Sequence, residues 1–212
     1  MVILVVILLL VLIPAATWWF GLWNNFLTLI NVLLAGLIAS SYYETLGARL
    51  ASDLRDYAKL ADFLALWVLF VVSFIVCRII TEFLSGYKME FDMVTEMIGR
   101  SLLSIWIACV FVAFTLFSFH MAPLHPDAFQ KDPEKATLGI GPDRMWLAFI
   151  QSRSRGALST SRDENFLADQ AAASTHPDDA DLGDVRVFDP HAQFIDQWHR
   201  SREQTSRVKG FR

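Results

Sequence analysis

The first part of the chain contains almost no charge. From Met1 to Tyr43 there is no Asp, Glu, Lys or Arg, and the first charged residue is Glu44. Residues 1–119 hold 6 of the 18 Lys and Arg and 8 of the 22 Asp and Glu. A soluble domain puts charged or polar residues on the outer face of its helices, whereas a helix surrounded by lipid has no such face. The missing charge therefore predicts a membrane protein.

Other absences exclude several classes of function. The two cysteines, Cys77 and Cys109, lie within apolar runs, which favours packing residues over a disulfide or a metal pair. The five histidines show no metal-ligand spacing. No nucleophile with a base, metal-binding set or Gly-rich phosphate loop is recognisable, so we expect no catalytic, metal or cofactor-binding residues and no enzyme. Without a basic block, nucleic acid is not an expected partner.

Four apolar runs are long enough to be membrane spans. A helix needs about 20 residues to cross a hydrocarbon core of about 30 Å. The runs are residues 2–20, 26–43, 63–80 and 98–119. We therefore expect an all-α membrane protein with a domain of four transmembrane helices at residues 1–119. A polar tail, residues 120–212, follows it.

A cleaved signal peptide is the alternative for the first run. Val2–Ile13 has the length of a signal-peptide core, and Pro14–Ala16 offers small residues for cleavage. No Lys or Arg precedes the run, although a signal peptide normally begins with one, and more apolar sequence follows at once. Retention of the first helix is the favoured interpretation.

The segment between the second and third runs predicts an amphipathic helix. Across residues 44–62, apolar side chains recur at spacings of three and four, and charged residues lie largely off that stripe. The stripe consists of Leu46, Leu50, Leu54, Tyr57 and Ala61. We expect this helix to lie on the membrane surface or to cap the bundle.

Small residues recur four apart within the spans, a spacing that lets helix backbones approach closely in lipid. These helix-packing candidates are Ala35 and Ala39, Gly36 and Ser40, and Ser104 and Ala108. They could pack helices within one chain or between the chains of a homo-oligomer.

Two arginines near span ends have acidic neighbours at helical spacing. Arg78 precedes Glu82 by four residues, and Arg100 follows Glu96 by four. Opposite charges four apart on a helix face each other, so both are predicted to form ion pairs at the membrane edge.

The tail contains one clear helical pattern. Met145, Trp146, Phe149 and Ile150 lie at helical spacing within residues 142–152. We expect Trp146, Phe149 and Ile150 to form an interaction element, which docks on the membrane or a partner, or packs back on its own membrane domain. Residues 159–183 have the composition of a disordered linker, and 185–198 regain apolar character.

The distribution of basic residues predicts the orientation. With four spans, the N-terminus, the 44–62 connection and the tail share one side of the membrane. That side carries Arg49, Arg55, Lys59, Lys131 and Lys135, and the other carries Arg78, Lys88 and Arg100. The positive-inside bias then places both termini in the cytoplasm.

The residues 21–43 resemble the second-helix region of the colicin V production protein family. The resemblance lies in a start at Gly21 that is similar to the family's Gly-Phe, a Leu-rich helix and the close Ala39-Ser40-Ser41-Tyr42-Tyr43. The order of elements over residues 1–119 is also similar to that family. In the family the last span opens with Asp-Arg, spaced glycines and Arg-Gly, whereas here Asp92, Gly99 and Arg100 stand in a different register.

This resemblance implies a multi-pass protein of the bacterial inner membrane. It would support toxin production or export, or envelope homeostasis, by oligomerising or by binding unknown envelope or secretion proteins. A small channel or transporter subunit is the alternative, with polar candidates Ser73, Arg78, Arg100, Ser104 and Thr115. A third possibility is that the tail acts in solution and the spans only anchor it.

Overall fold

The described part of the structure, a computed structural model, is built of helices. It covers residues 2–53, 58–85, 92–122, 139–154, 194–195 and 198–200. Its helices are α1 (Val2–Thr17), α2 (Leu22–Asp53), α3 (Ala58–Leu84), α4 (Met93–Met121) and α5 (Pro142–Ser154). No strand occurs in these residues. The all-α prediction is confirmed for this part of the chain.

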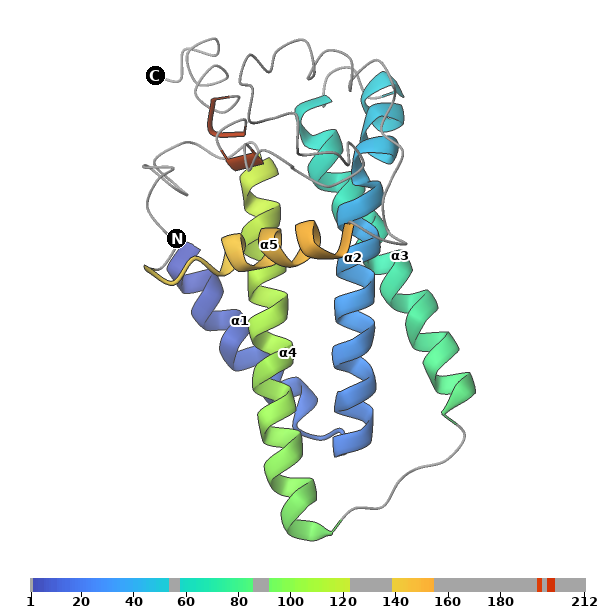
Figure 1. Ribbon diagram of the computed structural model, residues 1–212, viewed down its shortest axis with the longest axis vertical. Helices are drawn as coiled ribbons and strands as arrows, with labels where there is room; N and C mark the ends of the chain where they lie inside the picture. Colours follow the sequence, from blue (N-terminus) through green and yellow to red (C-terminus); the bar gives the residue numbers. More distant parts are fainter. Residues whose placement is uncertain are drawn as a thin grey trace.

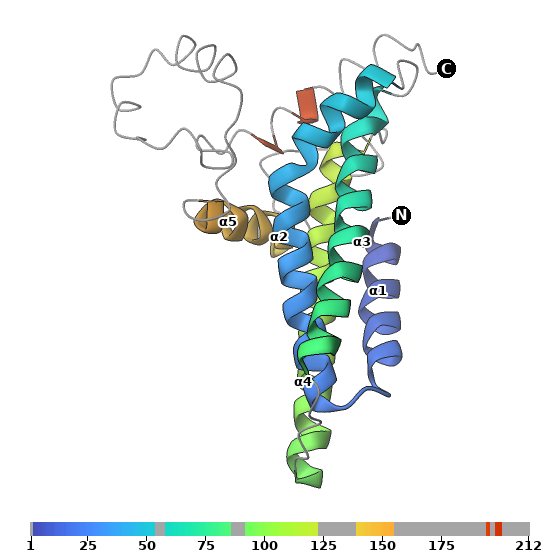
Figure 2. The ribbon, with the colours of Figure 1, turned by 90° about the vertical axis from the view of Figure 1, so that its right-hand side faces the viewer.

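The long helices form an elongated bundle. Helices α2, α3 and α4 run alternately up and down, α1 packs along α4, and α5 lies crosswise on the outside of α2 and α4 (Figures 1 and 2). We call the end with Trp18–Gly21, Ser85 and Asp92 the turn end. The end with Asp53, Ala58 and Met121 is the tail end.

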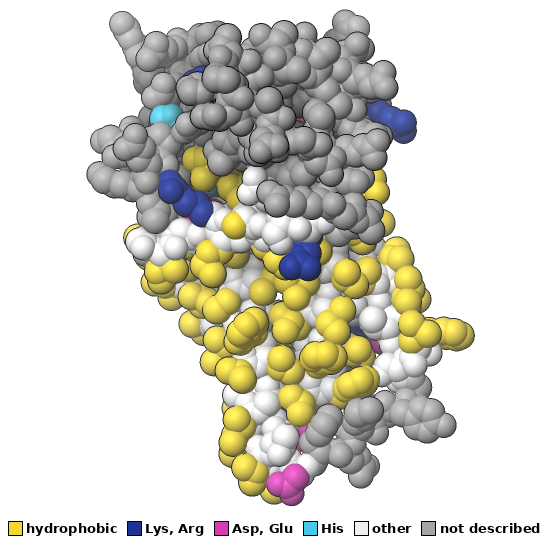
Figure 3. All heavy atoms as spheres, in the orientation of Figure 1, with side chains coloured by type: hydrophobic (Ala, Val, Ile, Leu, Met, Phe, Trp, Pro, Cys, Tyr) yellow, Lys and Arg dark blue, Asp and Glu magenta, His cyan; other side chains and the backbone are white. Residues whose placement is uncertain are grey.

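Three of the described helices are long and apolar enough to cross a membrane: Leu22–Leu50 of α2, Leu60–Leu84 of α3 and all of α4. Helix α1 is shorter, with 16 residues, or about 24 Å against a core of about 30 Å. Large apolar side chains on α1 and α3 are exposed, including Leu4, Val11, Val72 and Ile79. Hydrophobic side chains cover most of the visible face below α5 (Figure 3).

The predicted surface helix at residues 44–62 does not exist as a separate element. Helix α2 continues through this segment to Asp53, and α3 begins at Ala58. The stripe side chains Leu46 and Leu50 are half-buried. Gly47 is buried, and a Cβ there would overlap the Asp62 side chain of α3. The described stripe residues therefore belong to two long helices, Leu46 and Leu50 to α2 and Ala61 to α3, and not to a separate surface helix; Leu54 and Tyr57 lie outside the described residues.

Aromatic side chains form the core between α3, α4 and α5. The rings of Phe70 and Phe114 stack with centroids 4.5 Å apart, and Trp67 meets Phe114 edge-on at 5.6 Å. A second cluster joins α1 to α4 through Val6, Val112 and Leu116. These contacts place α4 at the centre of the molecule, where it touches every other helix.

Several sequence predictions fall outside the described residues. They are the disordered linker at 159–183 and most of the apolar element at 185–198. Within that element the structure describes Phe194, which is buried, and Trp198, whose ring lies 6.3 Å from that of Phe194.

Candidate functional site

Helix α5 docks on the membrane-spanning helices through one face. Trp146 and Ile150 are buried on this face, Phe149 is half-buried, and Met145 is exposed. The Trp146 ring meets the Phe114 ring of α4 edge-on at 5.7 Å. Of the two docking modes predicted for this element, the structure places it against its own membrane domain.

Gly36 of α2 makes room for Trp146. A Cβ at this position would lie 2.6 Å from Trp146 Cζ2, too close for any side chain. One turn further, Ser40 Oγ lies 3.4 Å from Trp146 Nε1, which donates to it. The predicted packing pair Gly36 and Ser40 therefore receives the indole of α5, and their neighbours Ala35 and Ala39 are fully buried in the same core.

A buried polar contact joins the start of α5 to the end of α4. His120 Nε2 and Asp143 Oδ2 lie 2.8 Å apart, and both side chains are fully buried. Burial of a charged or polar group is costly without a partner, so each stabilises the other in this position. Asp143 also lies in the first turn of α5, where a carboxylate is favoured by the helix dipole.

Phe194 packs over this contact. Its ring stacks on Phe117 at 5.0 Å and meets the His120 ring edge-on at 6.5 Å. Two segments of the tail, α5 and the residues around Phe194, therefore contact the same end of α4.

A layer of polar side chains joins α2 to α3 near the turn end. Asn31 Nδ2 donates to Thr81 Oγ1 at 2.9 Å, and Asn31 is fully buried. Arg78 donates to Thr28 Oγ1 at 3.2 Å and lies 2.6 Å from Glu82 Oε1, so it forms an ion pair with Glu82. Polar contacts of this kind hold helices together in lipid, where hydrophobic attraction between them is weak.

Asn25 joins three helices. Its buried amide donates to Thr17 O of α1 at 3.2 Å, and to Arg100 O at 3.4 Å and Ser104 Oγ at 3.2 Å on α4. Its Oδ1 is buried and has no hydrogen-bond partner in the described part of the chain, and the same holds for Asn31 Oδ1. The packing candidates Ser104 and Ala108 are both buried, and Ser104 takes part in this contact.

The predicted ion pair between Glu96 and Arg100 is absent. Glu96 Oε1 accepts a hydrogen bond of 2.8 Å from the backbone N–H of Leu22, the first residue of α2. The first N–H groups of a helix have no partner within it, and a nearby carboxylate satisfies one of them. The Arg100 guanidinium instead lies over the Trp18 ring, 4.8 Å from its centroid. The spacing of four residues favours an ion pair, but Glu96 bonds the N–H of Leu22 at the α1–α2 turn instead of Arg100.

Sequence reasoning missed Asn25, Asn31, His120 and Asp143 as contact residues. A signal for the polar layer was present: Asn24, Thr28 and Asn31 are spaced by four and three, and Arg78, Thr81 and Ser85 by three and four. Each set forms one polar stripe on a span. No pattern in the sequence pairs His120 with Asp143, because 23 residues separate them and helical spacing relates only near neighbours.

The described residues contain no group of three or more His, Cys, Asp or Glu that could hold a metal ion. Cys77 and Cys109 are free thiols. The described residues therefore provide two candidate sites: the docked helix α5 and, nearer the turn end, the buried polar layer between α2 and α3.

Comparison with known families gave one match. The model of the family described as colicin V production protein matches residues 1–138 of this chain. No curated protein and no solved structure matches it. The matched range includes α1 to α4 and ends before α5.

Proposed function

The chain belongs to the colicin V production protein family, and from this membership we propose that it supports toxin production or export, or envelope homeostasis, in the bacterial inner membrane. Its apolar helices and its family make it a multi-pass membrane protein. We further propose that α1 is a fourth span, retained in the mature protein, and that both termini lie in the cytoplasm. The proposed mode of action is oligomerisation or partner binding, not catalysis.

The docking of α5 carries this proposal. Trp146 is buried between α2 and α4, and Asp143 contacts His120 at the end of α4. A tail attached in this way moves together with the spanning helices. A partner that binds the tail would therefore be mechanically connected to the membrane domain, as expected for a component of an export or envelope assembly.

A deletion strain tests the proposal. Cells without the protein are scored for toxin export, detergent sensitivity and dye uptake, and then complemented with the full chain, Trp146→Ala or Met145→Ala. We expect the full chain and Met145→Ala to restore the defects, because Met145 is 64% exposed. Trp146→Ala, which vacates the site on Gly36, should restore them only in part at equal membrane levels.

The outcomes separate two claims. A deletion strain without any of the three defects would contradict the proposed role. Full complementation by Trp146→Ala would contradict the importance of the docked helix and leave the role itself in place.

One observation favours a small channel or transporter subunit as the second candidate. The buried acceptors Asn25 Oδ1 and Asn31 Oδ1 have no hydrogen-bond partner among the described residues, and unpaired polar groups within spans often line a route for water or a solute. Purified protein in liposomes should then conduct a small solute, and Asn31→Leu should abolish the flux. Liposomes that stay as tight as protein-free ones would exclude this candidate.

A further inference from the structure

Within the described residues, Arg100 has a charge with no carboxylate paired with it. It forms no ion pair with a carboxylate of the described residues, since Glu96, one turn away, bonds the N–H of Leu22. Its side chain is half-buried, and its Nε is buried without a hydrogen-bond partner among the residues that the structure describes. An arginine stays protonated at all ordinary pH values, so within a membrane it requires an anion or water nearby.

The backbone around Arg100 is held in place by buried contacts. Asn25 Nδ2 and Ser104 Oγ both donate to the carbonyl oxygen of Arg100, at 3.4 Å and 2.7 Å. Asn25 and Ser104 are 0% and 1% exposed. The Trp18 ring limits the guanidinium on one side. The guanidinium is therefore presented from a rigid base and does not depend on a flexible loop.

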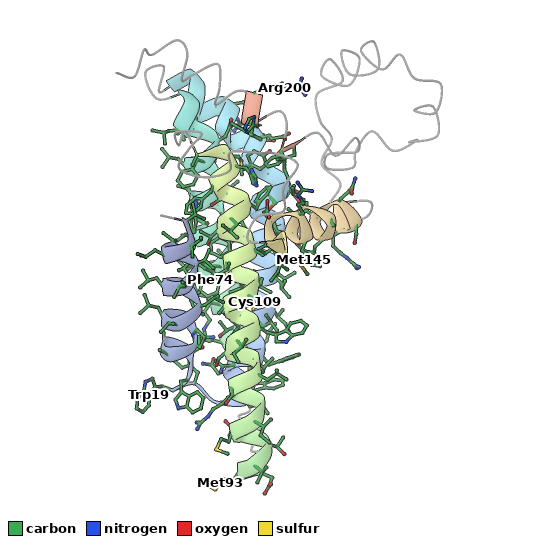
Figure 4. All side chains as sticks on the ribbon, turned by 90° about the vertical axis from the view of Figure 1, so that its left-hand side faces the viewer. Trp19, Phe74, Met93, Cys109, Met145 and Arg200 are labelled. Carbon is green, nitrogen blue, oxygen red and sulfur yellow. The ribbon has the colours of Figure 1, made fainter. Side chains whose placement is uncertain are left out.

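The position of Arg100 indicates the membrane–water boundary. Trp18, Trp19 and Phe20 are 42%, 86% and 46% exposed at the α1–α2 turn, and Trp19 points away from the bundle at the end far from α5 (Figure 4). Exposed tryptophans of membrane proteins gather at the level of the lipid headgroups. The guanidinium lies against Trp18 and hence at that level.

Exposed apolar side chains lie on α4 between Arg100 and the middle of the helix. Leu102, Ile105 and Trp106 are 56%, 52% and 59% exposed. A small soluble anion would gain nothing from these side chains, whereas a molecule that combines a phosphate with acyl chains would contact both. Arginine binds phosphate oxygens through paired N–H donors.

We propose that Arg100, with Trp18 beside it and Asn25 as a positioning residue beneath it, binds the phosphate of one anionic phospholipid at the turn end. The guanidinium donates to the phosphate oxygens, and the acyl chains lie against the exposed apolar residues of α4. This site is separate from the α5 docking site and does not depend on the proposed role in export.

Native mass spectrometry of the purified full chain in detergent tests the site. Phosphatidylglycerol and phosphatidylcholine with the same acyl chains are the probes. We expect one phosphatidylglycerol to bind at least about tenfold more tightly than phosphatidylcholine, which corresponds to one charge-assisted contact of about 1.4 kcal/mol. Arg100→Gln should remove that preference. Arg100→Lys should keep part of it, because lysine retains the charge without the paired donors.

Arg78→Gln is the matched control. It removes the same charge from the same end of the bundle, but Arg78 is already paired with Glu82. It should leave the preference unchanged. Equal binding of the two lipids, an unaltered preference in Arg100→Gln, or displacement of phosphatidylglycerol by millimolar inorganic phosphate would overturn the proposal. If Arg100→Gln does not fold, Arg100→Lys is the test. A preference for phosphatidylglycerol equal to that of the parent chain would contradict binding through the paired N–H donors of Arg100.

Discussion

At the scale of residues, buried amides decide how the spans meet. Asn25 and Asn31 lie six residues apart on α2, and both are fully buried. The amide of Asn25 has acceptors on α1 and α4, whereas that of Asn31 has one acceptor on α3. Side-chain hydrogen bonds between membrane helices contribute about 0.6 kcal/mol on average and up to about 1.7 kcal/mol. The two asparagines should therefore contribute unequally to stability.

We expect Asn25→Ala to lower the free energy of unfolding by about 1–2 kcal/mol and Asn31→Ala by about 0.6–1 kcal/mol. Unfolding of the detergent-solubilised protein by sodium dodecyl sulfate, followed by circular dichroism, measures both. Asn24→Ala is the control, because Asn24 is only half-buried and forms no side-chain hydrogen bond with the described residues. If Asn31→Ala lowered the free energy of unfolding more than Asn25→Ala, the hydrogen bonds by which Asn25 joins three helices would not be the larger contribution to stability.

At the scale of elements, α5 is held by shape and by one polar contact. The indole of Trp146 fits where α2 has a glycine, and Asp143 reaches His120 of α4. Both contacts lie on one face of α5, while Arg144 and Arg153 are exposed. Lys or Arg side chains are visible at the level of α5, where the apolar surface ends (Figure 3). A docked apolar face and exposed cations make α5 an amphipathic helix.

Gly36→Leu should displace α5. A Cβ at residue 36 overlaps the Trp146 ring, and overpacking of a filled site costs about 1–3 kcal/mol. Proteolysis of a locally opened segment follows the population of the open form. We therefore expect trypsin to cleave after Arg144 and Arg153 about tenfold faster in this variant, with the products identified by mass spectrometry.

Leu34→Ala is the control for α5 release. Leu34 lies on the same helix with 43% of its surface exposed, so its removal should leave the cleavage rate unchanged. If Gly36→Leu were cleaved no faster than the parent chain, α5 would be held by contacts other than the Trp146 site.

At the scale of the whole molecule, alternation of the helices defines two ends. The exposed residue Ser152 follows the docking face of α5, and the exposed residue Asp92 lies at the turn end before α4. Helix α5 lies nearer the tail end, and the start of α4 lies at the opposite end of the bundle (Figures 1 and 4). The two residues should therefore face opposite sides of the membrane.

Cysteine labelling in intact cells tests this topology. Cys77 and Cys109 are replaced by Ala, and Ser152→Cys or Asp92→Cys is introduced singly. With the tail in the cytoplasm, a membrane-impermeant maleimide should label Asp92→Cys in intact cells and Ser152→Cys only after lysis. The reverse pattern would invert the orientation, and labelling of both in intact cells would contradict the alternation of spans.

The sequence by itself determined that the described part of the chain is helical, where the apolar helices lie and that residues 142–152 form one more. Runs without charge and spacings of three and four residues are local properties, and they are visible without a partner. Tertiary structure alone decided that Gly47 of α2 packs against Asp62 of α3, that Gly36 accommodates Trp146, and that Glu96 bonds Leu22 across 74 residues instead of Arg100. Periodicity tells which side of a helix is apolar or polar, but the contact made by that side depends on the segment that the chain brings against it.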